Sequence, residues 1–147
     1  MGTILYGSEI AKDIRTSLKV QIDELREKGK RIPKLVVILV GDNPASLSYV
    51  TGKEKACREI GMENILLRLQ EDTTEEALLA EIHRLNTDTS VDGILVQLPL
   101  PKHMDEHKVL FAIDPQKDVD GFHSYIIGML SLQEDSYLPC IPKGILR

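Results

Sequence analysis

The feature that most constrains the fold is an uninterrupted apolar segment, Leu35–Val40, which leads directly into Gly41-Asp42-Asn43-Pro44-Ala45-Ser46. Apolar segments of this length are typical of strands buried on both faces, as in parallel sheets covered by helices on each side. The residues from Ser46 onward are predicted to form a helix that ends near Gly61. A buried strand that leads into a helix through a short turn indicates an α/β domain.

Two more strands are predicted, at Asn64–Leu69 and Asp92–Gln97. Helical patterns precede the first strand and separate each strand from the next. This alternation predicts a three-layer α/β/α domain with a mostly parallel sheet and right-handed crossovers. The sequence contains no internal repeat, so we expect residues 1–147 to form one domain.

Local signals place the remaining helices. Residues 8–28 carry apolar side chains at helical spacing, with Ser8 as the predicted N-cap, and we expect this helix to cover one face of the sheet. A capping box is predicted at Thr73, with Glu76 at the third helical position. A short helix is predicted at 105–113. No periodicity is evident in the final residues, from 124 to 147.

Composition limits the class of protein. The 147 residues are 42% hydrophobic and 28% charged, which is typical of a globular domain. A net charge of −5 argues against a nucleic-acid or anionic-membrane partner. No apolar segment is long enough to cross a bilayer, and the two cysteines form no metal-binding pair. With no secretory signal in view, we expect a cytoplasmic protein that holds no metal.

The first candidate site lies at the start of the helix after the buried strand. At about 100° per residue, Ser46, Tyr49 and Lys53 fall on one helical face. A hydroxyl, a phenol and an amine would then stand at the carboxyl end of a strand, where open α/β sheets bind small ligands. The alternative is an ordinary turn, capped by Asn43 or Ser46, followed by an exposed helix surface.

The second candidate site follows the third predicted strand. Gln97 ends this strand, and Leu98-Pro99-Leu100-Pro101 then forms a stiff apolar wall. Because parallel strands end at one edge of the sheet, Gln97 is expected to face the lysine cluster, although a plain connecting loop fits equally well. The later segment Lys117–His123 carries two carboxylates, and spacing alone predicts only a solvated turn there. A G-x-G-x-x-G dinucleotide fingerprint is absent.

Five ordered motifs spread over most of the chain carry a family resemblance. They are Val40-Gly41-Asp42-Asn43-Pro44-Ala45-Ser46, Tyr49-Val50-x-x-Lys53, Asp92-Gly93-Ile94-Leu95-Val96-Gln97-Leu98-Pro99-Leu100-Pro101, Lys117-Asp118-Val119-Asp120-Gly121-Phe122 and Pro139-Cys140-x-Pro142-x-Gly144. Together they resemble the bifunctional methylenetetrahydrofolate dehydrogenase/methenyltetrahydrofolate cyclohydrolase family. The resemblance implies the folate-binding catalytic domain of an enzyme that oxidises 5,10-methylenetetrahydrofolate and hydrolyses 5,10-methenyltetrahydrofolate to 10-formyltetrahydrofolate.

The resemblance also implies roles for individual residues. Lys53 would be the catalytic lysine, and Tyr49 would stack on the folate ring system. Gln97 would hydrogen-bond and tune Lys53, and Asp120 would bind the polar edge of the pterin, which brings its loop to the site after all. The remaining substrate-binding positions would be Ser46, Leu98, Pro99 and Leu100.

Cofactor and partners follow from the same resemblance. Relatives bind NADP or NAD in a C-terminal Rossmann domain and are generally homodimers. We expect this chain to stop before that domain, to bind tetrahydrofolate derivatives and to bind no nicotinamide cofactor alone. This chain also differs from the usual family pattern at Ser124, Ile126 and Ile141, where relatives usually have Pro, Asn and Thr. A non-catalytic folate-binding or assembly module is the alternative.

Overall fold

The computed structural model describes residues 6–146 and contains one parallel sheet. Its strand order is β2-β1-β3, with β1 at Lys34–Val40, β2 at Glu63–Leu69 and β3 at Gly93–Val96. All but the first residue of the central strand are buried. The predicted strands are therefore confirmed, with shifts of one residue at some ends.

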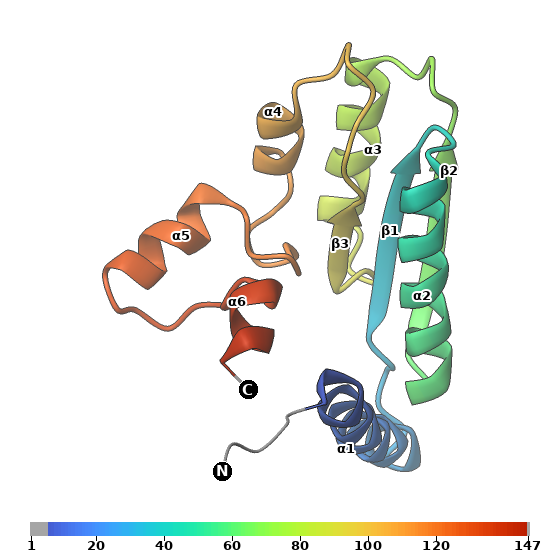
Figure 1. Ribbon diagram of the computed structural model, residues 1–147, viewed down its shortest axis with the longest axis vertical. Helices are drawn as coiled ribbons and strands as arrows, with labels where there is room; N and C mark the ends of the chain where they lie inside the picture. The colour runs from blue at the N-terminus through green and yellow to red at the C-terminus, as the bar shows by residue number, and fades with distance from the viewer. Residues whose placement is uncertain (1–5, 147) are drawn as a thin grey trace.

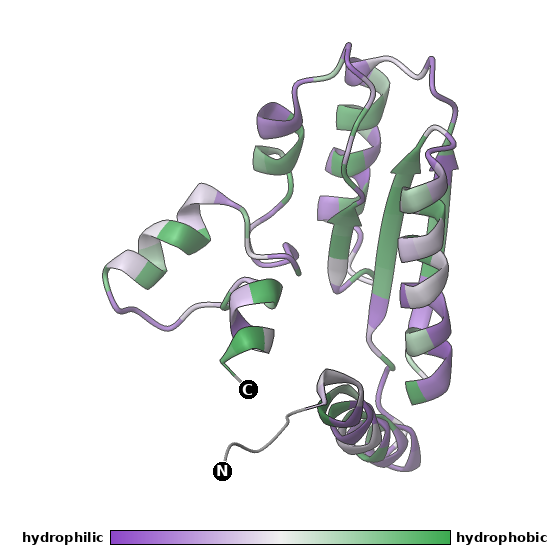
Figure 2. Cartoon of the chain, in the orientation of Figure 1, coloured by the Kyte–Doolittle hydropathy of each residue, from purple (hydrophilic) through white to green (hydrophobic). Residues whose placement is uncertain are grey.

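Helices cover both faces of the sheet (Figure 1). One face of β1 packs against α2 (Pro44–Ile60) through Val50 and Cys57. The other face packs against α3 (Glu75–Thr87) and α4 (Glu106–Phe111) in the larger of the two cores. Figure 2 shows the corresponding concentration of hydrophobic residues along β1 and β3. The three-layer α/β/α prediction is confirmed.

The first helix does not cover the sheet as predicted. In Figure 1, α1 (Gly7–Glu27) lies beyond the amino end of β1, beside the C-terminal end of α2. Arg26 Nη2 donates a hydrogen bond to Gly61 O at 3.1 Å, which ties the two helix ends together. Ile22 is the one buried residue of α1, so its apolar stripe is only partly used.

Two predicted N-caps are wrong. The α1 N-cap is Tyr6, without a side-chain hydrogen bond, rather than Ser8. The α3 N-cap is Thr74, whose Oγ1 accepts a hydrogen bond from Ala77 N at 3.2 Å, so the capping box predicted at Thr73 does not form. Thr73 belongs to the preceding turn, because its N–H donates to Gln70 O at 3.0 Å.

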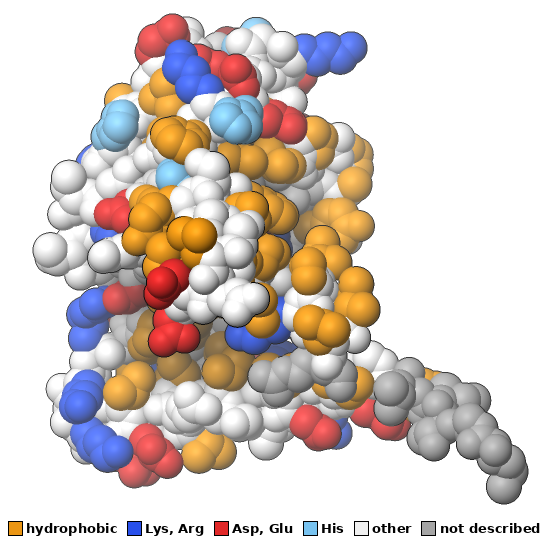
Figure 3. All heavy atoms as spheres, turned by 90° about the vertical axis from the view of Figure 1, so that its left-hand side faces the viewer, with side chains coloured by type: hydrophobic (Ala, Val, Ile, Leu, Met, Phe, Trp, Pro, Cys, Tyr) orange, Lys and Arg blue, Asp and Glu red, His pale blue; other side chains and the backbone are white. Residues whose placement is uncertain are grey.

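Two helices occur where the sequence shows no periodicity. They are α5 (Ser124–Ser131) and α6 (Cys140–Ile145). Figure 3 views the molecule from their side, where hydrophobic side chains are exposed across the middle of the face. The exposed large hydrophobic residues of this region are Phe111, Phe122, Tyr125, Ile127, Leu132, Tyr137, Leu138, Ile141, Ile145 and Leu146. Among residues 6–146, no helix is both long and apolar enough to cross a membrane.

The core predicts a clear contrast between two leucines. Leu78 on α3 is 0% exposed, whereas Leu132 is 74% exposed. Leu78→Ala is expected to lower the free energy of unfolding by about 2–5 kcal/mol, because it removes buried apolar area and leaves a cavity. Leu132→Ala should change it by less than about 0.5 kcal/mol. Urea unfolding of both variants tests this, and equal losses would contradict the described core.

Candidate active site

The turn after β1 sets the direction of α2. Gly41 has a φ of +82°, and its N–H donates to Leu69 O at 3.0 Å. Asn43 is the N-cap, and its Oδ1 accepts hydrogen bonds from Ala45 N and Ser46 N at 3.0 and 3.2 Å. Pro44 opens the helix, where its missing N–H has no cost. Of the two predicted caps, Asn43 is therefore the one used.

Three candidate residues follow along α2 in very different environments. Ser46 is 1% exposed and its hydroxyl donates to Leu98 O at 3.5 Å, while Tyr49 is 66% exposed. Lys53, one helical turn beyond Tyr49, is partly buried. Tyr49 and Lys53 are thus open to a ligand, whereas Ser46 connects α2 to the loop after β3.

The strongest direct contact in the site joins Lys53 to Gln97. Lys53 Nζ donates to Gln97 Oε1 at 2.9 Å, and Gln97 Nε2 donates to Leu98 O at 2.9 Å. Only the amide nitrogen can donate to a carbonyl, so the Leu98 carbonyl fixes which end of the Gln97 amide faces the lysine. The predicted approach of Gln97 to the lysine is confirmed.

The apolar wall after β3 has a defined shape. The Leu98–Pro99 peptide bond is cis. Leu100 is buried in the larger core, Leu98 packs at its edge, and Pro99 is exposed. Of these three predicted binding residues, Pro99 and part of Leu98 are accessible from outside.

The loop after α4 returns to the sheet. Ile94 N donates to Lys117 O at 2.8 Å, and Ile94 forms a parallel bridge with Asp118. Lys117 Nζ donates to Leu85 O and Asp88 O, both at 2.8 Å, which anchors the segment to the end of α3. Spacing alone predicts a solvated turn for this segment, and that prediction is wrong.

This return brings Asp120 into the electrostatic field of Lys53. Burial raises the pKa of the Asp120 carboxyl, the positive charge of Lys53 opposes the rise, and the negative charge of Asp118 adds to it. The Lys53 ammonium and the half-buried Asp120 carboxyl therefore lie close enough to interact electrostatically, and Gln97 accepts a hydrogen bond from the ammonium. The site can exchange protons and can bind polar N–H groups.

Cys140 is a neighbour of the site that reasoning from spacing missed. Its Sγ donates to Val119 O at 3.2 Å. Cys140 is exposed as a residue, but partial desolvation of its thiol raises the pKa, and the negative charge of Asp120 raises it further. The side chain is therefore held as a thiol rather than a reactive thiolate. Its signal in the sequence was the Pro139-Cys140 motif, which resemblance alone had singled out.

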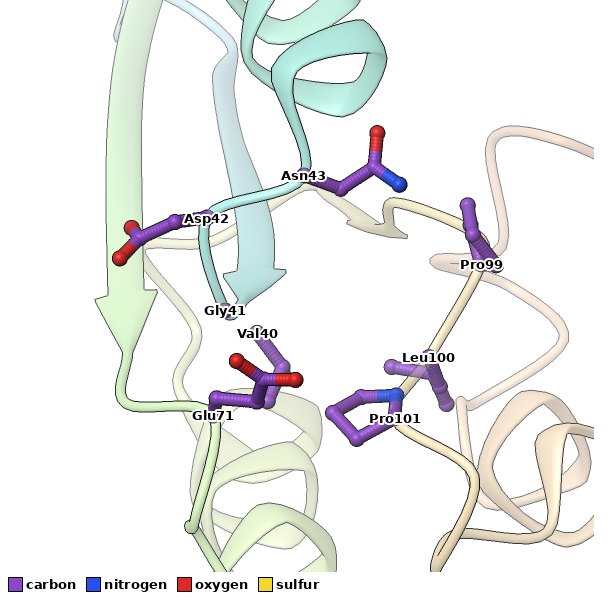
Figure 4. Close-up of a pocket in the computed structure, with 8 residues that line it drawn as sticks. All are labelled: Val40, Gly41, Asp42, Asn43, Glu71, Pro99, Leu100 and Pro101. Carbon is purple, nitrogen blue, oxygen red and sulfur yellow. The ribbon is translucent and has the colours of Figure 1, made fainter.

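A cavity of about 340 Å³ lies beside this site and not at Lys53 (Figure 4). In Figure 4, Glu71 and Pro101 face each other across it, while Asn43 lies on the side of Pro99. Asp42 turns away toward β2, where it pairs with Arg68 Nη2 at 3.0 Å. The hydrogen-bonded chemistry at Lys53 identifies the candidate active site better than cavity size does. No metal-binding cluster of His, Cys, Asp and Glu occurs in the described part of the chain.

Comparison with known proteins agrees with this geometry. Residues 5–120 match the family described as the tetrahydrofolate dehydrogenase/cyclohydrolase catalytic domain. The chain belongs to this family. It is 55% identical over 147 residues to the bifunctional protein FolD of Exiguobacterium sibiricum, covering 100% of this chain and 53% of that protein.

Solved structures of family members share the fold. The Campylobacter jejuni FolD dehydrogenase/cyclohydrolase aligns with a TM-score of 0.94 and 46% identity, covering 98% of this chain and 51% of that one. The Trypanosoma brucei FolD, complexed with NADP and an inhibitor, aligns with a TM-score of 0.92 and 32% identity, covering 99% and 50%. This chain therefore spans about half the length of these family members.

The start of α2 and the cavity beside it do not fit a dinucleotide. The two N–H groups at the start of α2 already donate to Asn43 Oδ1. The cavity beside them is bordered by the carboxylate of Glu71, which disfavours a pyrophosphate. These residues are therefore not assigned to a nicotinamide cofactor.

The raised pKa of Asp120 has a defined effect on stability. Above its ordinary value of 3.8, the unfolded state loses this proton while the folded state retains it. Stability is therefore lost as the pH rises from 3.8 to the folded pKa. Asp120→Asn has no carboxyl to titrate, so its free energy of unfolding should rise relative to that of wild type as the pH increases through this interval. Urea unfolding at a series of pH values measures the difference.

Asp88→Asn provides a control of opposite sign. Hydrogen bonds from the Ser90 hydroxyl and N–H lower the pKa of Asp88. Its stabilisation is present above 3.8 and is lost as the pH falls through the lower folded pKa. The difference in the free energy of unfolding between Asp88→Asn and wild type should therefore change with pH below pH 3.8 and stay constant above it. An Asp120→Asn difference that is independent of pH would contradict the buried position of Asp120.

Proposed function

We propose that this chain is the folate-binding catalytic part of a methylenetetrahydrofolate dehydrogenase/methenyltetrahydrofolate cyclohydrolase, with Lys53 as the proton-transfer group. The observation that carries the proposal is the hydrogen bond of 2.9 Å from Lys53 Nζ to Gln97 Oε1, with the Asp120 carboxyl within the electrostatic influence of the same ammonium. Membership of the family supplies the substrate class, tetrahydrofolate derivatives.

The hydrolytic reaction needs one proton acceptor and one proton donor. The methenyl substrate is a cation, and water attacks its bridging carbon to form a neutral adduct. The proton released from that water passes to the amine form of Lys53. When the bond from this carbon to N5 of the folate breaks, the Lys53 ammonium returns its proton to N5, and the hydroxyl loses its own proton to water as it becomes the formyl oxygen. Gln97 holds Lys53 in place for both transfers.

The surroundings of Lys53 suit a flat, polar ring system. The exposed ring of Tyr49, one turn before Lys53, offers a face for stacking, and Pro99 offers an apolar edge. The Asp120 carboxylate accepts hydrogen bonds from the N–H groups of a pterin. Ser46 and Leu100 act behind this surface, because both are buried and support the loop that carries Leu98 and Pro99.

Oxidation of the methylene substrate requires a hydride acceptor. We assign that role to a nicotinamide cofactor bound outside the residues of this chain, as the family relationship supports. The Trypanosoma brucei relative was solved with NADP. The residues described here would then contribute substrate binding and orientation to the hydride step, and proton transfer to the hydrolytic step.

Loss of methenyltetrahydrofolate absorbance tests the proposal. Lys53→Ala is expected to lower the rate above buffer by about 10²–10⁴-fold, the usual contribution of a general acid–base group. Lys55→Ala is the matched control, because Lys55 is exposed on the same helix but lies about 160° around it from Lys53 and about 120° from Tyr49. Lys55→Ala should retain the wild-type rate.

Calorimetry with tetrahydrofolate separates the remaining outcomes. Binding without turnover by the wild-type chain would make it a folate-binding module and would reject the catalytic proposal for the isolated chain. Absence of both binding and turnover would reject a functional folate site in this chain. Equal rates for wild type and Lys53→Ala would remove the lysine from the mechanism.

A further inference from the structure

We propose that Asp118 is a positioning residue, whose buried carboxylate holds the 118–123 loop in the shape that directs Asp120 toward Lys53. The inference rests on the proposed function of this site and adds a residue to it. Asp118 would not touch substrate. It would act entirely through the placement of Asp120.

The first argument is how the Asp118 carboxylate is satisfied. Its residue is 5% exposed, and it takes part in none of the ion pairs found among residues 6–146. Three backbone N–H groups donate to it instead: Asp120 and Gly121 to Oδ1, both at 3.1 Å, and His123 to Oδ2 at 2.8 Å. A buried carboxylate requires such donors, so the loop is folded around it.

The second argument is that both ends of this loop are fixed. At its start, the bridge between Ile94 and Asp118 ties it to β3, the strand that leads to Gln97. At its end, His123 Nδ1 accepts from Tyr125 N at 3.0 Å, and His123 Nε2 lies 3.1 Å from Phe111 O, to which it donates. The His123 ring also stacks on Phe111 at 4.5 Å. Asp118 therefore holds the segment that lies between these two anchors.

The third argument is the tight path of the chain between these anchors. Gly121 has a φ of +73°, and a Cβ at this position would lie 3.3 Å from the Pro139 backbone. The loop therefore has little room to adopt a second shape while α6 stays in place. The charge of Asp118 also contributes to raising the pKa of Asp120, so the two carboxyls are close in space.

A double-mutant cycle tests the proposal. Tetrahydrofolate affinity is measured by calorimetry for wild type, Asp118→Asn, Asp120→Asn and the double variant. Asp118→Asn is expected to weaken binding on the order of 10-fold, because an amide replaces a charged acceptor of three hydrogen bonds. With Asp120 already replaced, adding Asp118→Asn should weaken binding less than about 2-fold further. Independent, multiplying losses would overturn the proposal.

A readout without folate separates this proposal from the proposed function. The Asp120 carboxyl is titrated by carbon-13 NMR in wild type, Asp118→Asn and Asp88→Asn. The pKa of Asp120 should fall in Asp118→Asn, which removes a nearby charge and lets water reach the loop, and should not change in Asp88→Asn. An unchanged pKa in Asp118→Asn would overturn the positioning role even if no folate binds. Failure of wild type to bind tetrahydrofolate would overturn only the proposed function.

A second variant covers a failure of Asp118→Asn to fold. Gly121→Ala keeps the Asp118 charge but strains the loop at its positive φ and against Pro139. Gly121→Ala should weaken tetrahydrofolate binding when it is introduced into the wild-type chain and have little effect when it is introduced into the Asp120→Asn variant. An equal loss in both backgrounds would show that the loop does not act through Asp120 and would overturn the proposal.

Discussion

The burial of β1 on both faces is the constraint on which the site depends. Hydrophobic side chains of this strand alternate between the core beneath α2 and the core beneath α3 and α4. Both neighbours pair with β1 in parallel, so the strand ends gather at one edge of the sheet. Gln97 N donates to Ile38 O at 2.9 Å, which extends this pairing to the residue that contacts Lys53.

The two carboxyls of the 117–123 loop have different environments, and this difference organises the site. Asp118 is satisfied by backbone N–H groups and turned inward. Asp120 interacts electrostatically with Lys53, and its pKa is raised by burial and partly restored by the lysine. One residue can therefore maintain the loop while the other meets a ligand. Such a division of roles is a common result of placing similar groups in unlike surroundings.

The sequence was sufficient to predict the sheet, because hydrophobic periodicity dictates its strands, whereas parallel strand order offered the Lys53–Gln97 approach only as one of two alternatives. It failed for α5 and α6, which are short and whose pattern carries no clear signal. Their positions depend on contacts between distant residues, such as His123 with Phe111 and Cys140 with Val119. The α3 cap was misplaced by one residue because Thr73 and Thr74 are chemically equivalent candidates.

Local pattern thus determined which segments are strands, which helix follows the buried strand, and that Lys53 lies on the same helical face as Tyr49. The tertiary structure alone decided that the loop of Asp120 returns to the sheet near Lys53 and that Ser46 is turned inward to Leu98. The physical reason is the separation along the sequence between the residues that interact. Periodicity is set by neighbours within a few residues. Ile94 pairs with Asp118, and Lys53 hydrogen-bonds Gln97, across long intervals of sequence. Only the folded sheet brings these partners together.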